Sequence, residues 1–300
     1  MTDWLKPGDR LSVVAPSGAL KNLDIFQQGL EIWKSQGYSL DLGFGVDSRW
    51  GYLAGKDSER QQQLLMALAD PDCQGVLCAR GGYGAARVLE GLGTLPPISH
   101  RKFLIGFSDI TALLWGLRHQ SIGVHGPVLT TLAQEPTESL QRLFKWLETG
   151  YLDPLQGQGW GVGQAQGWLL PGNLTVATHL LGTPYQPDVT GAILAFEDVN
   201  EEPYRIDRML TQWRMLGLFD RIRGIALGRF SQWQRSFSSD SFTLEEVLRD
   251  RLGDLGIPVV SDLPFGHDGP NMMLPVGVTV TLDADRGILS FDASNSLKSP

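Results

Sequence analysis

The sequence is poor in cysteine, and its two thiols predict neither a zinc site nor a disulfide framework. Cys73 and Cys78 are the only cysteines in 300 residues. Their spacing matches no zinc-binding pattern, and two thiols are too few to cross-link a fold of this size. We expect Cys73 in a loop and Cys78, reduced, in a strand. Stability must then come from a hydrophobic core, and a chain that is 42% hydrophobic is long enough to form two domains or one large one.

The sequence also lacks an excess of positive charge and any long apolar run. Lys and Arg total 25 against 33 Asp and Glu, and the formal net charge of −8 provides no field that attracts nucleic acid or anionic lipid. No uninterrupted apolar run reaches the roughly 18 residues that a membrane span needs, and no basic segment followed by an apolar one opens the chain. We therefore expect a cytoplasmic protein with no nucleic-acid or membrane partner.

Short apolar segments alternate with segments of helical periodicity through the first half of the chain. Strands are predicted at residues 11–15, 38–42, 75–79, 103–107 and 122–125. Helices are predicted at residues 23–36, 58–69, 85–92 and 137–148, and after Ser108. Ser58 and Gln61 have the spacing of a capping box at the start of the second helix. This alternation predicts a doubly wound parallel sheet with helices on both faces, in which ligands bind at the carboxyl ends of the strands.

Residues 150–167 are rich in glycine and hold few helix formers, so we place the domain boundary there. The expected parts are an α/β domain at 1–150, a linker at 151–166 and a second domain at 167–300. Beyond the linker we predict helices at 172–181, 203–216 and from 243, and strands at 192–196, 222–227, 276–282 and 287–291. The last two strands favour antiparallel pairing. The second domain is therefore expected to be mixed α/β.

Ser108 stands at the corner between the apolar run 103–107 and the helix that follows. A hydroxyl there lies over the first unpaired N–H groups of the helix, whose partial positive charge can hold an anion. The residues Gly106-Phe107-Ser108-Asp109 begin like the Gly-x-Ser-x-Gly nucleophile elbow but lack its second glycine. Serine is also among the best N-caps. This stretch alone favours an ordinary cap and leaves a nucleophile as the alternative.

A serine nucleophile requires a base and a group that orients the base. Of the five histidines, His125 at a strand end and His267 in a turn-rich loop are the candidates, and their local sequence does not separate them. His100, His119 and His179 are expected at the surface or in helix packing. Glu197 follows a predicted strand and is the first candidate carboxylate. Its neighbours Asp198, Glu201 and Glu202 are the alternatives, the last two being better placed to supply negative charge to a helix N-terminus.

The turn Arg80-Gly81-Gly82-Tyr83-Gly84 is a second candidate site. Its glycines permit close backbone approach before a helix, so it can hold a phosphate or donate to an oxyanion, or serve as a plain tight turn. The dinucleotide pattern Gly-x-Gly-x-x-Gly fails because Arg87 stands at its third glycine position. Phosphate binding is therefore the weaker functional interpretation.

These segments together resemble the LD-carboxypeptidase family of serine peptidases, which includes muramoyltetrapeptide carboxypeptidases and the microcin C self-immunity hydrolases. The resemblance covers nearly the whole chain in order. It is carried by Val13-Val-Ala-Pro-Ser17-Gly18, the Arg80–Gly84 turn, Gly106-Phe-Ser108-Asp109, His125-Gly-Pro127, Gly172-Asn-Leu174, Glu197-Asp198 and Gly266-His267. It implies an active site between an N-terminal domain that carries the nucleophile and a C-terminal domain that carries the acid and the base.

The resemblance also implies the role of each residue in the site. Ser108 is the nucleophile, His267 the general base and Glu197 the carboxylate that orients it. The backbone N–H groups of Gly82 and Asp109 form the oxyanion hole, and His125 has a structural or pocket role. The substrate-binding residues that we expect are Arg80, Tyr83 and Arg229.

The activity implied is removal of the terminal D-alanine from cytoplasmic muropeptide tetrapeptides during peptidoglycan recycling. We expect no metal, since no metal-ligand spacing surrounds the site residues, and no cofactor. The family commonly forms homodimers, so a homodimer is expected. One alternative is a detoxifying amidase that acts on peptide-nucleotide conjugates, although the chain is short for that subgroup. Another is a non-catalytic α/β protein that binds a phosphate ligand through the Arg80–Gly84 turn.

Overall fold

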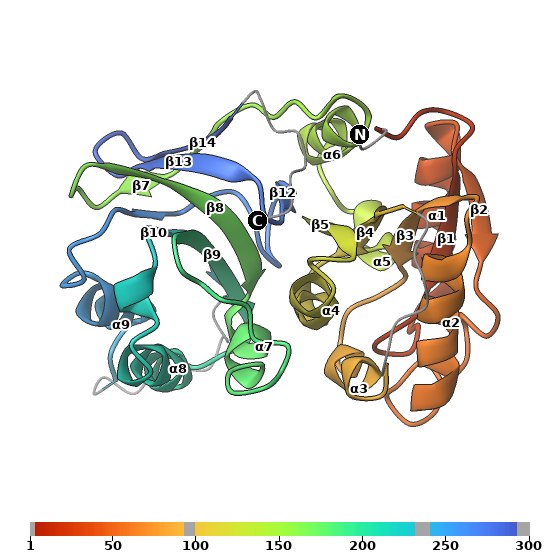
Figure 1. Ribbon diagram of the computed structural model, residues 1–300, viewed down its shortest axis with the longest axis horizontal. Helices are drawn as coiled ribbons and strands as arrows, with labels where there is room; N and C mark the ends of the chain where they lie inside the picture. The colour runs from red at the N-terminus through yellow and green to blue at the C-terminus, as the bar shows by residue number, and fades with distance from the viewer. Residues whose placement is uncertain (1–3, 93–99, 232–240, 293–300) are drawn as a thin grey trace.

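The computed structural model describes residues 4–92, 100–231 and 241–292, which form two sheets lying side by side, each covered by helices. Figure 1 shows the N-terminal half of the chain on the right and the C-terminal half on the left. Within the described residues, no helix combines the length and the hydropathy that crossing a membrane requires.

The N-terminal sheet is parallel, as predicted, apart from one short edge strand. Its strands are β1 (Arg10–Val14), β2 (Ser39–Leu42), β3 (Cys73–Cys78), β4 (Lys102–Gly106) and β5 (Ser121–His125), in the order β5-β4-β3-β1-β2. This is a doubly wound order. The chain adds strands toward one edge of the sheet from β1 to β2 and toward the other edge from β3 onward, so the order reverses between β1 and β3. Both cysteines are buried at the two ends of β3, so Cys73 belongs to the strand and not to a loop.

Helices cover both faces of this sheet because the strands are apolar on both sides. One face packs against α1 (Leu23–Ser35), α5 (Leu129–Leu132) and α6 (Thr137–Thr149). The other packs against α2 (Asp57–Ala69), α3 (Ala85–Glu90) and α4 (Thr111–Gly116), the last preceded by the 3-10 turn η1 (Ser108–Ile110).

The predicted start of α2 was wrong. The helix begins at Asp57, and the backbone N–H of Lys56 donates a 2.8 Å hydrogen bond to the carboxylate of Glu59. A charged carboxylate is a stronger acceptor than the amide of Gln61 that we paired with Ser58. The Gln61 amide instead donates to the carbonyls of α3.

The C-terminal sheet has parallel strands at its centre and antiparallel strands at its edges, which confirms the mixed α/β prediction. Its order is β6-β14-β13-β8-β9-β10-β11-β7. The strands are β6 (Leu155–Gln156), β7 (Gln158–Gly159), β8 (Gln164–Asn173), β9 (Ala192–Val199), β10 (Gly224–Ser231), β11 (Val259–Ser261), β13 (Thr279–Asp283) and β14 (Ile288–Phe291). The helices are α7 (Leu174–His179), α8 (Pro203–Met215) and α9 (Leu244–Leu252), with the 3-10 turn η2 (Phe219–Arg221).

The glycine-rich residues 151–166 are part of this sheet and not an unstructured connection. They contribute β6, β7 and the start of β8. A Cβ at Gly157 would lie 2.2 Å from the carbonyl oxygen of Ser261, and one at Gly159 would lie 2.0 Å from that of Ala284. These two glycines therefore permit backbones to approach closely. Strand β8 also continues through Gly172 and Asn173, where we expected a helix.

The two halves of the molecule are joined by more than one crossing of the chain. After β11 the chain returns to the N-terminal half, where β12 (Leu274–Pro275) pairs antiparallel with β5. A continuous apolar cluster also runs from α4 of one half to α7 and α8 of the other. The loop between β11 and β12, which carries His267, is thus held at the junction.

Candidate active site

Ser108 follows β4 at a sharp turn and has a backbone φ of 63°. A non-glycine residue rarely adopts this left-handed conformation, which is a feature of nucleophile elbows. An N-cap residue has an extended backbone, so the interpretation of Ser108 as an ordinary cap was wrong. The residue at the cap position of η1 is Phe107.

Two glycines make room for this turn. A Cβ at Gly106 would lie 2.7 Å from the side chain of Ile110, the residue that stands at the motif's missing second glycine. A Cβ at Gly81 would lie 3.1 Å from the Cβ of Ser108, so the turn after β3 packs directly on the serine. The carboxyl ends of β3 and β4 therefore bring the two candidate sites of the sequence together.

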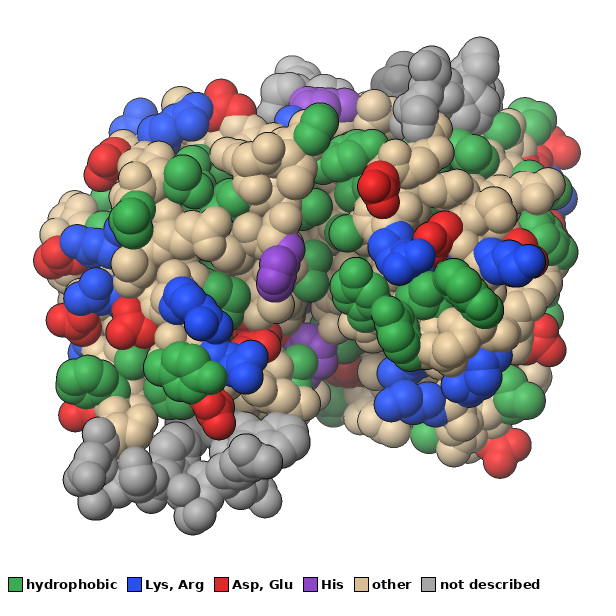
Figure 2. Space-filling model, turned by 90° about the horizontal axis from the view of Figure 1, so that it is seen from below, with side chains coloured by type: hydrophobic (Ala, Val, Ile, Leu, Met, Phe, Trp, Pro, Cys, Tyr) green, Lys and Arg blue, Asp and Glu red, His purple; other side chains and the backbone are tan. Residues whose placement is uncertain are grey.

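Ser108, His267 and Glu197 form one chain of hydrogen bonds across the two halves of the molecule. The Oγ of Ser108 lies 2.9 Å from Nε2 of His267, and Nδ1 of His267 lies 2.5 Å from Oε2 of Glu197. The Glu197 side chain is fully buried at the end of β9, whereas the His267 side chain is 17% exposed. Seen from below in Figure 2, the surface is hollowed between the two halves, and histidine side chains lie along this hollow.

The imidazole of His267 is set up to accept a proton. Burial by itself lowers the pKa of His267, but the charge of Glu197 and its hydrogen bond, together with the charges of Asp198 and Asp268, more than offset that effect and raise the pKa above its ordinary value. The ring of Phe107 packs against the imidazole with centroids 4.8 Å apart. The ring is thus held in position from both sides of the cleft.

Asn173 positions the buried carboxylate of Glu197. The Asn173 amide nitrogen donates to Oε1 of Glu197 at 3.3 Å and to Oδ1 of Asp198 at 3.1 Å, and its backbone N–H donates to the Thr111 hydroxyl. The other oxygen of Asp198 accepts from the N–H and the hydroxyl of Thr175. Asn173 therefore ties the end of β9 to the start of α4, the helix after Ser108, and Asp198 ties it to α7. We assigned no role to Asn173 from the sequence, although it belongs to a family landmark.

The alternative carboxylates are not the partner of His267. Glu201 forms an ion pair of 3.7 Å with Arg205, which is on α8, and Glu202 is the residue directly before that helix. Asp198 lies beside Glu197, but its carboxylate accepts hydrogen bonds from Thr175 in the first turn of α7. Of the four acidic residues, Glu197 is the one hydrogen-bonded to His267.

The backbone of Asp109 is oriented by its own side chain. The Asp109 carboxylate accepts a 2.5 Å hydrogen bond from the hydroxyl of Ser17, after β1, and a 2.8 Å one from the N–H of Ala85, at the start of α3. Burial raises the pKa of this carboxyl, partly offset by these two hydrogen bonds. The ends of β1, β3 and β4 are therefore tied to one another beside Ser108.

Arg229 supports the loop that carries His267. Its guanidinium donates a 2.7 Å hydrogen bond to the carbonyl of Pro270, and a Cβ at Gly266 or Gly269 would contact Arg229. On the N-terminal side, the Glu135 carboxylate accepts from the N–H of Asn271 at 2.9 Å. The loop is thus anchored to both halves of the molecule.

Arg80 and Tyr83, our other two candidate binding residues, line a pocket of about 470 Å³ at the Arg80–Gly84 turn. Arg229 is not among the residues that line it.

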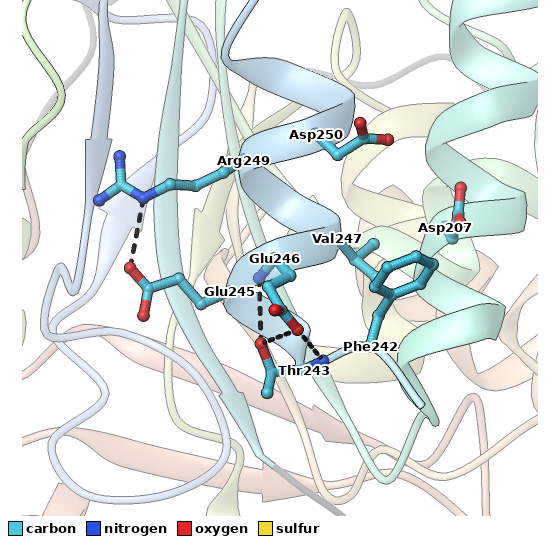
Figure 3. Close-up of a pocket in the computed structure, with 8 residues that line it drawn as sticks. All are labelled: Asp207, Phe242, Thr243, Glu245, Glu246, Val247, Arg249 and Asp250. Carbon is cyan, nitrogen blue, oxygen red and sulfur yellow. Dashed lines mark hydrogen bonds and ion pairs between the residues drawn. The ribbon is translucent and has the colours of Figure 1, made fainter. Parts of the chain in front are cut away.

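A pocket of about 510 Å³ lies between α8 and α9, far along the chain from Ser108 (Figure 3). Its polar groups are already paired: the Glu246 carboxylate accepts from Thr243, and Glu245 pairs with Arg249. None of the described residues that line this pocket is a histidine, serine or cysteine. The nucleophile and base are therefore found at the cleft and not here.

Comparison with known proteins places this chain in a family. Residues 11–126 match the LD-carboxypeptidase N-terminal domain, and residues 166–282 match the LD-carboxypeptidase C-terminal domain. A Synechocystis sp. protein provisionally named a carboxypeptidase is 56% identical over 96% of this chain and 95% of its own. The chain belongs to the LD-carboxypeptidase family. Another relative, 34% identical over 94% of this chain and 96% of its own, is named a murein tetrapeptide carboxypeptidase, from Pseudomonas aeruginosa.

Solved structures agree with the LD-carboxypeptidase fold. The muramoyltetrapeptide carboxypeptidase from Oxalobacter formigenes is 28% identical, covers 93% of this chain and 97% of its own, and superimposes with a TM-score of 0.78. The protein MccF, in complex with glutamyl sulfamoyl guanosine, is 22% identical, covers 98% of both chains and has a TM-score of 0.87. The chain is therefore a peptidase, and the names of its LD-carboxypeptidase relatives support a carboxypeptidase activity.

Proposed function

We propose that this protein is a serine LD-carboxypeptidase in which Ser108 is the nucleophile, His267 the general base and Glu197 the orienting carboxylate. The observation that carries the proposal is the continuous chain of hydrogen bonds from Ser108 through His267 to Glu197. Each group has the partner that its role requires: the serine faces a base, and the base faces a buried carboxylate. The left-handed backbone of Ser108 adds support, because it directs the hydroxyl away from the sheet.

Catalysis starts when Nε2 of His267 removes the Ser108 proton as Oγ attacks the carbonyl carbon that precedes the terminal residue. The carbonyl oxygen becomes an oxyanion, which the backbone N–H groups of Gly82 and Asp109 stabilise. The protonated imidazole gives its proton to the leaving amine, and the peptide bond breaks to leave an acyl-enzyme on Ser108. His267 then takes a proton from water, whose oxygen attacks the ester carbon. The bond between Oγ and the acyl group breaks, the shortened peptide leaves as a carboxylic acid, and the imidazolium returns the proton to Oγ of Ser108.

Glu197 acts through the imidazole without exchanging protons itself. Its carboxylate accepts from the far ring nitrogen, which fixes the tautomer that leaves Nε2 free to accept the serine proton. It also stabilises the imidazolium that forms during attack. Asn173 holds this carboxylate in position.

The substrate that we propose is the muropeptide L-Ala-γ-D-Glu-diaminopimelate-D-Ala, cut between the L-centre of diaminopimelate and the terminal D-alanine. The names of the Pseudomonas aeruginosa relative and of the Oxalobacter formigenes structure support this class of substrate. The same fold is found in MccF, so a detoxifying amidase that acts on peptide-nucleotide conjugates is the second candidate.

The deciding experiment incubates the purified protein with this tetrapeptide and follows it by mass spectrometry. We expect loss of one alanine and formation of the tripeptide. The same tetrapeptide with L-alanine in place of the terminal D-alanine is the matched control and should remain intact. Cleavage of an aminoacyl sulfamoyl nucleoside in place of the tetrapeptide would favour the amidase.

A second experiment distinguishes an enzyme from a ligand-binding protein. A serine-reactive phosphonate should label the protein at Ser108 and fail to label the Ser108→Ala variant, since only an activated serine reacts. Absence of labelling, together with binding of inorganic phosphate at the Arg80–Gly84 turn, would favour the phosphate-binding alternative.

We also propose that the protein acts as a cytoplasmic homodimer. The support is the resemblance to the family together with the acidic composition of the chain. Light scattering after size-exclusion chromatography, and fractionation of the source cells, test these two points; a monomer or a membrane-associated protein would contradict them.

A further inference from the structure

The pocket at the Arg80–Gly84 turn gathers positive charge on a protein that is acidic overall. The cations Lys21, Arg49 and Arg80 line it, with Tyr52 and Tyr83, and none of its described lining residues is acidic. The formal charge of the whole chain is −8. A volume of about 470 Å³ is within the range of small-molecule sites. The pocket is therefore a local positive site with room for part of a peptide.

Two of the cations are held in place by neighbouring carbonyl groups. Arg80 donates to the carbonyl of Ala19 at 3.0 Å, and Arg49 donates to that of Leu20 at 2.6 Å. Consecutive residues of the segment after β1 thus fix the two guanidinium groups near each other. Burial lowers the pKa of the half-buried Arg80, and the nearby charge of Arg49 lowers it further.

Nothing in the described part of the chain neutralises this charge. The ion pairs between described residues include neither Lys21, Arg49 nor Arg80. Each guanidinium uses one N–H on a carbonyl and has others left for a ligand. Two like charges fixed side by side are stabilised by an anion, and the planar guanidinium matches a carboxylate.

The pocket adjoins the reacting groups. Gly82 lines it, and Gly81, the preceding residue, packs on Ser108. Its residues lie in the segments that follow β1, β2 and β3. The order of the strands across the sheet reverses between β1 and β3. In doubly wound folds, ligands bind outside the carboxyl ends of the strands at this switch point. The rings of Tyr52 and Tyr83, 5.8 Å apart, form an exposed rim.

We propose that Lys21, Arg49 and Arg80 form the site that binds a free carboxylate of the peptide substrate and so aligns the scissile bond with Ser108. The proposal rests on the proposed function, because it names the part of the substrate that this pocket receives. The carboxylate is either that of the terminal D-alanine or one farther back in the peptide, on glutamate or diaminopimelate. The terminal one would explain how a serine nucleophile is restricted to the last residue of a chain.

The test measures kcat/KM for Arg49→Gln and Lys21→Gln against the tetrapeptide and against three analogues, each with one carboxylate converted to an amide. With the unmodified tetrapeptide, Arg49→Gln should lose about ten- to hundred-fold, mainly through KM, because a charge-assisted hydrogen bond is lost. Arg49→Lys should recover part of the loss. With the analogue that lacks the bound carboxylate, wild type and variants should have equal rates.

The analogue on which the rates converge identifies the source of the carboxylate. Convergence on the terminal amide assigns the pocket to the leaving residue, and convergence on an internal amide assigns it to the acyl side. Equal losses on all four substrates, or no loss on any, would overturn the proposal.

Two controls keep this outcome separate from other failures. Arg223→Gln removes an exposed arginine at the amino end of β10, away from the strand ends that carry the site, and should behave as wild type. Melting temperatures show whether each variant is folded. Lys21 makes no side-chain hydrogen bond to described residues, so Lys21→Gln should fold normally. Wild-type protein that cleaves none of the substrates, and that a phosphonate does not label, would instead refute the proposed function itself.

Discussion

Nε2 of His125 lies 3.9 Å from Oε1 of Glu197, so the buried carboxylate that binds His267 has a second imidazole on its other side. The two histidines are in different states. His125 is fully buried between Phe107 and Phe265, and burial, followed by the charge of His267, lowers the pKa of His125 to about 3. His125 is therefore neutral at working pH and its ring nitrogens have no hydrogen-bond partner among the described residues, whereas His267 is hydrogen-bonded to both Ser108 and Glu197.

This difference predicts unequal effects of removing the two rings. His267→Ala should lower kcat by on the order of 10⁴ or more, because the proposed base is lost. His125→Ala should leave kcat within about tenfold per folded molecule and mainly lower the melting temperature, because it opens a cavity in the core. Activity and thermal melting of both variants test this. Inactive but fully folded His125→Ala, beside active His267→Ala, would reverse the assignment of the base.

His125 should also make the fold sensitive to acid. Its pKa is lower in the folded state than in the unfolded chain, so between about pH 6.5 and pH 3 the unfolded state binds more protons. Stability from this residue is therefore lost as the pH falls through that window. The variant His125→Gln should show a weaker decline of the unfolding free energy from pH 6.5 to pH 4, measured by urea titration. An unchanged pH dependence would contradict a buried neutral imidazole.

Ser108→Ala should abolish turnover and leave the fold intact, since the nucleophile is lost while the backbone can stay as it is. The left-handed conformation of Ser108 costs a non-glycine residue on the order of 1–3 kcal/mol. Ser108→Gly should therefore be equally inactive and melt at the same or a higher temperature than Ser108→Ala. Retained turnover in either variant would remove Ser108 from the nucleophile role, and collapse of the fold would indicate a structural one.

Glu197→Gln keeps the shape of the side chain but removes its charge. By comparison with Ser-His-Asp enzymes, kcat should fall on the order of 10⁴ with KM little changed. Glu197 is also a main cause of the raised pKa of His267. Activity requires neutral His267, so the wild-type rate should rise as the pH passes above that raised pKa, and in the variant this rise should move to lower pH. If the rate of the variant rose over the same pH range as that of the wild type, Glu197 would not be what raises the pKa of His267.

Chelators should leave activity unchanged. Ser108, His267 and Glu197 already supply a nucleophile, a base and an orienting carboxylate, and this chemistry needs no Lewis acid. The measurement is the rate of tetrapeptide cleavage before and after dialysis against EDTA, with an untreated sample as control. Loss of activity that zinc restores would show that the proposed mechanism is wrong.

The elements of the N-terminal half were predictable from the sequence because helical and strand periodicities are local properties. The apolar runs at 11–15, 75–79 and 103–107 each overlap a strand of one parallel sheet and extend one residue past its end. Since parallel strands end at the same edge, the turn at Arg80–Gly84 and Ser108 were expected as neighbours, and Gly81 does contact Ser108. The family landmarks added His267 and Glu197, which local patterns alone did not separate from His125 or Asp198.

Other features depended on contacts between residues far apart in the chain, and only the tertiary structure decided them. The backbone of Ser108 is left-handed, and Gly81, from the turn after another strand, packs against its side chain, a contact that no local cap signal contains. The glycines at 157 and 159 belong to a sheet because partners at 261 and 284 approach them closely. Arg49 gave no signal in the sequence. Arg49 lies near Arg80 because the two guanidinium groups donate to the successive carbonyls of Leu20 and Ala19 after β1. These contacts between distant segments form only when the strands have assembled into the sheet.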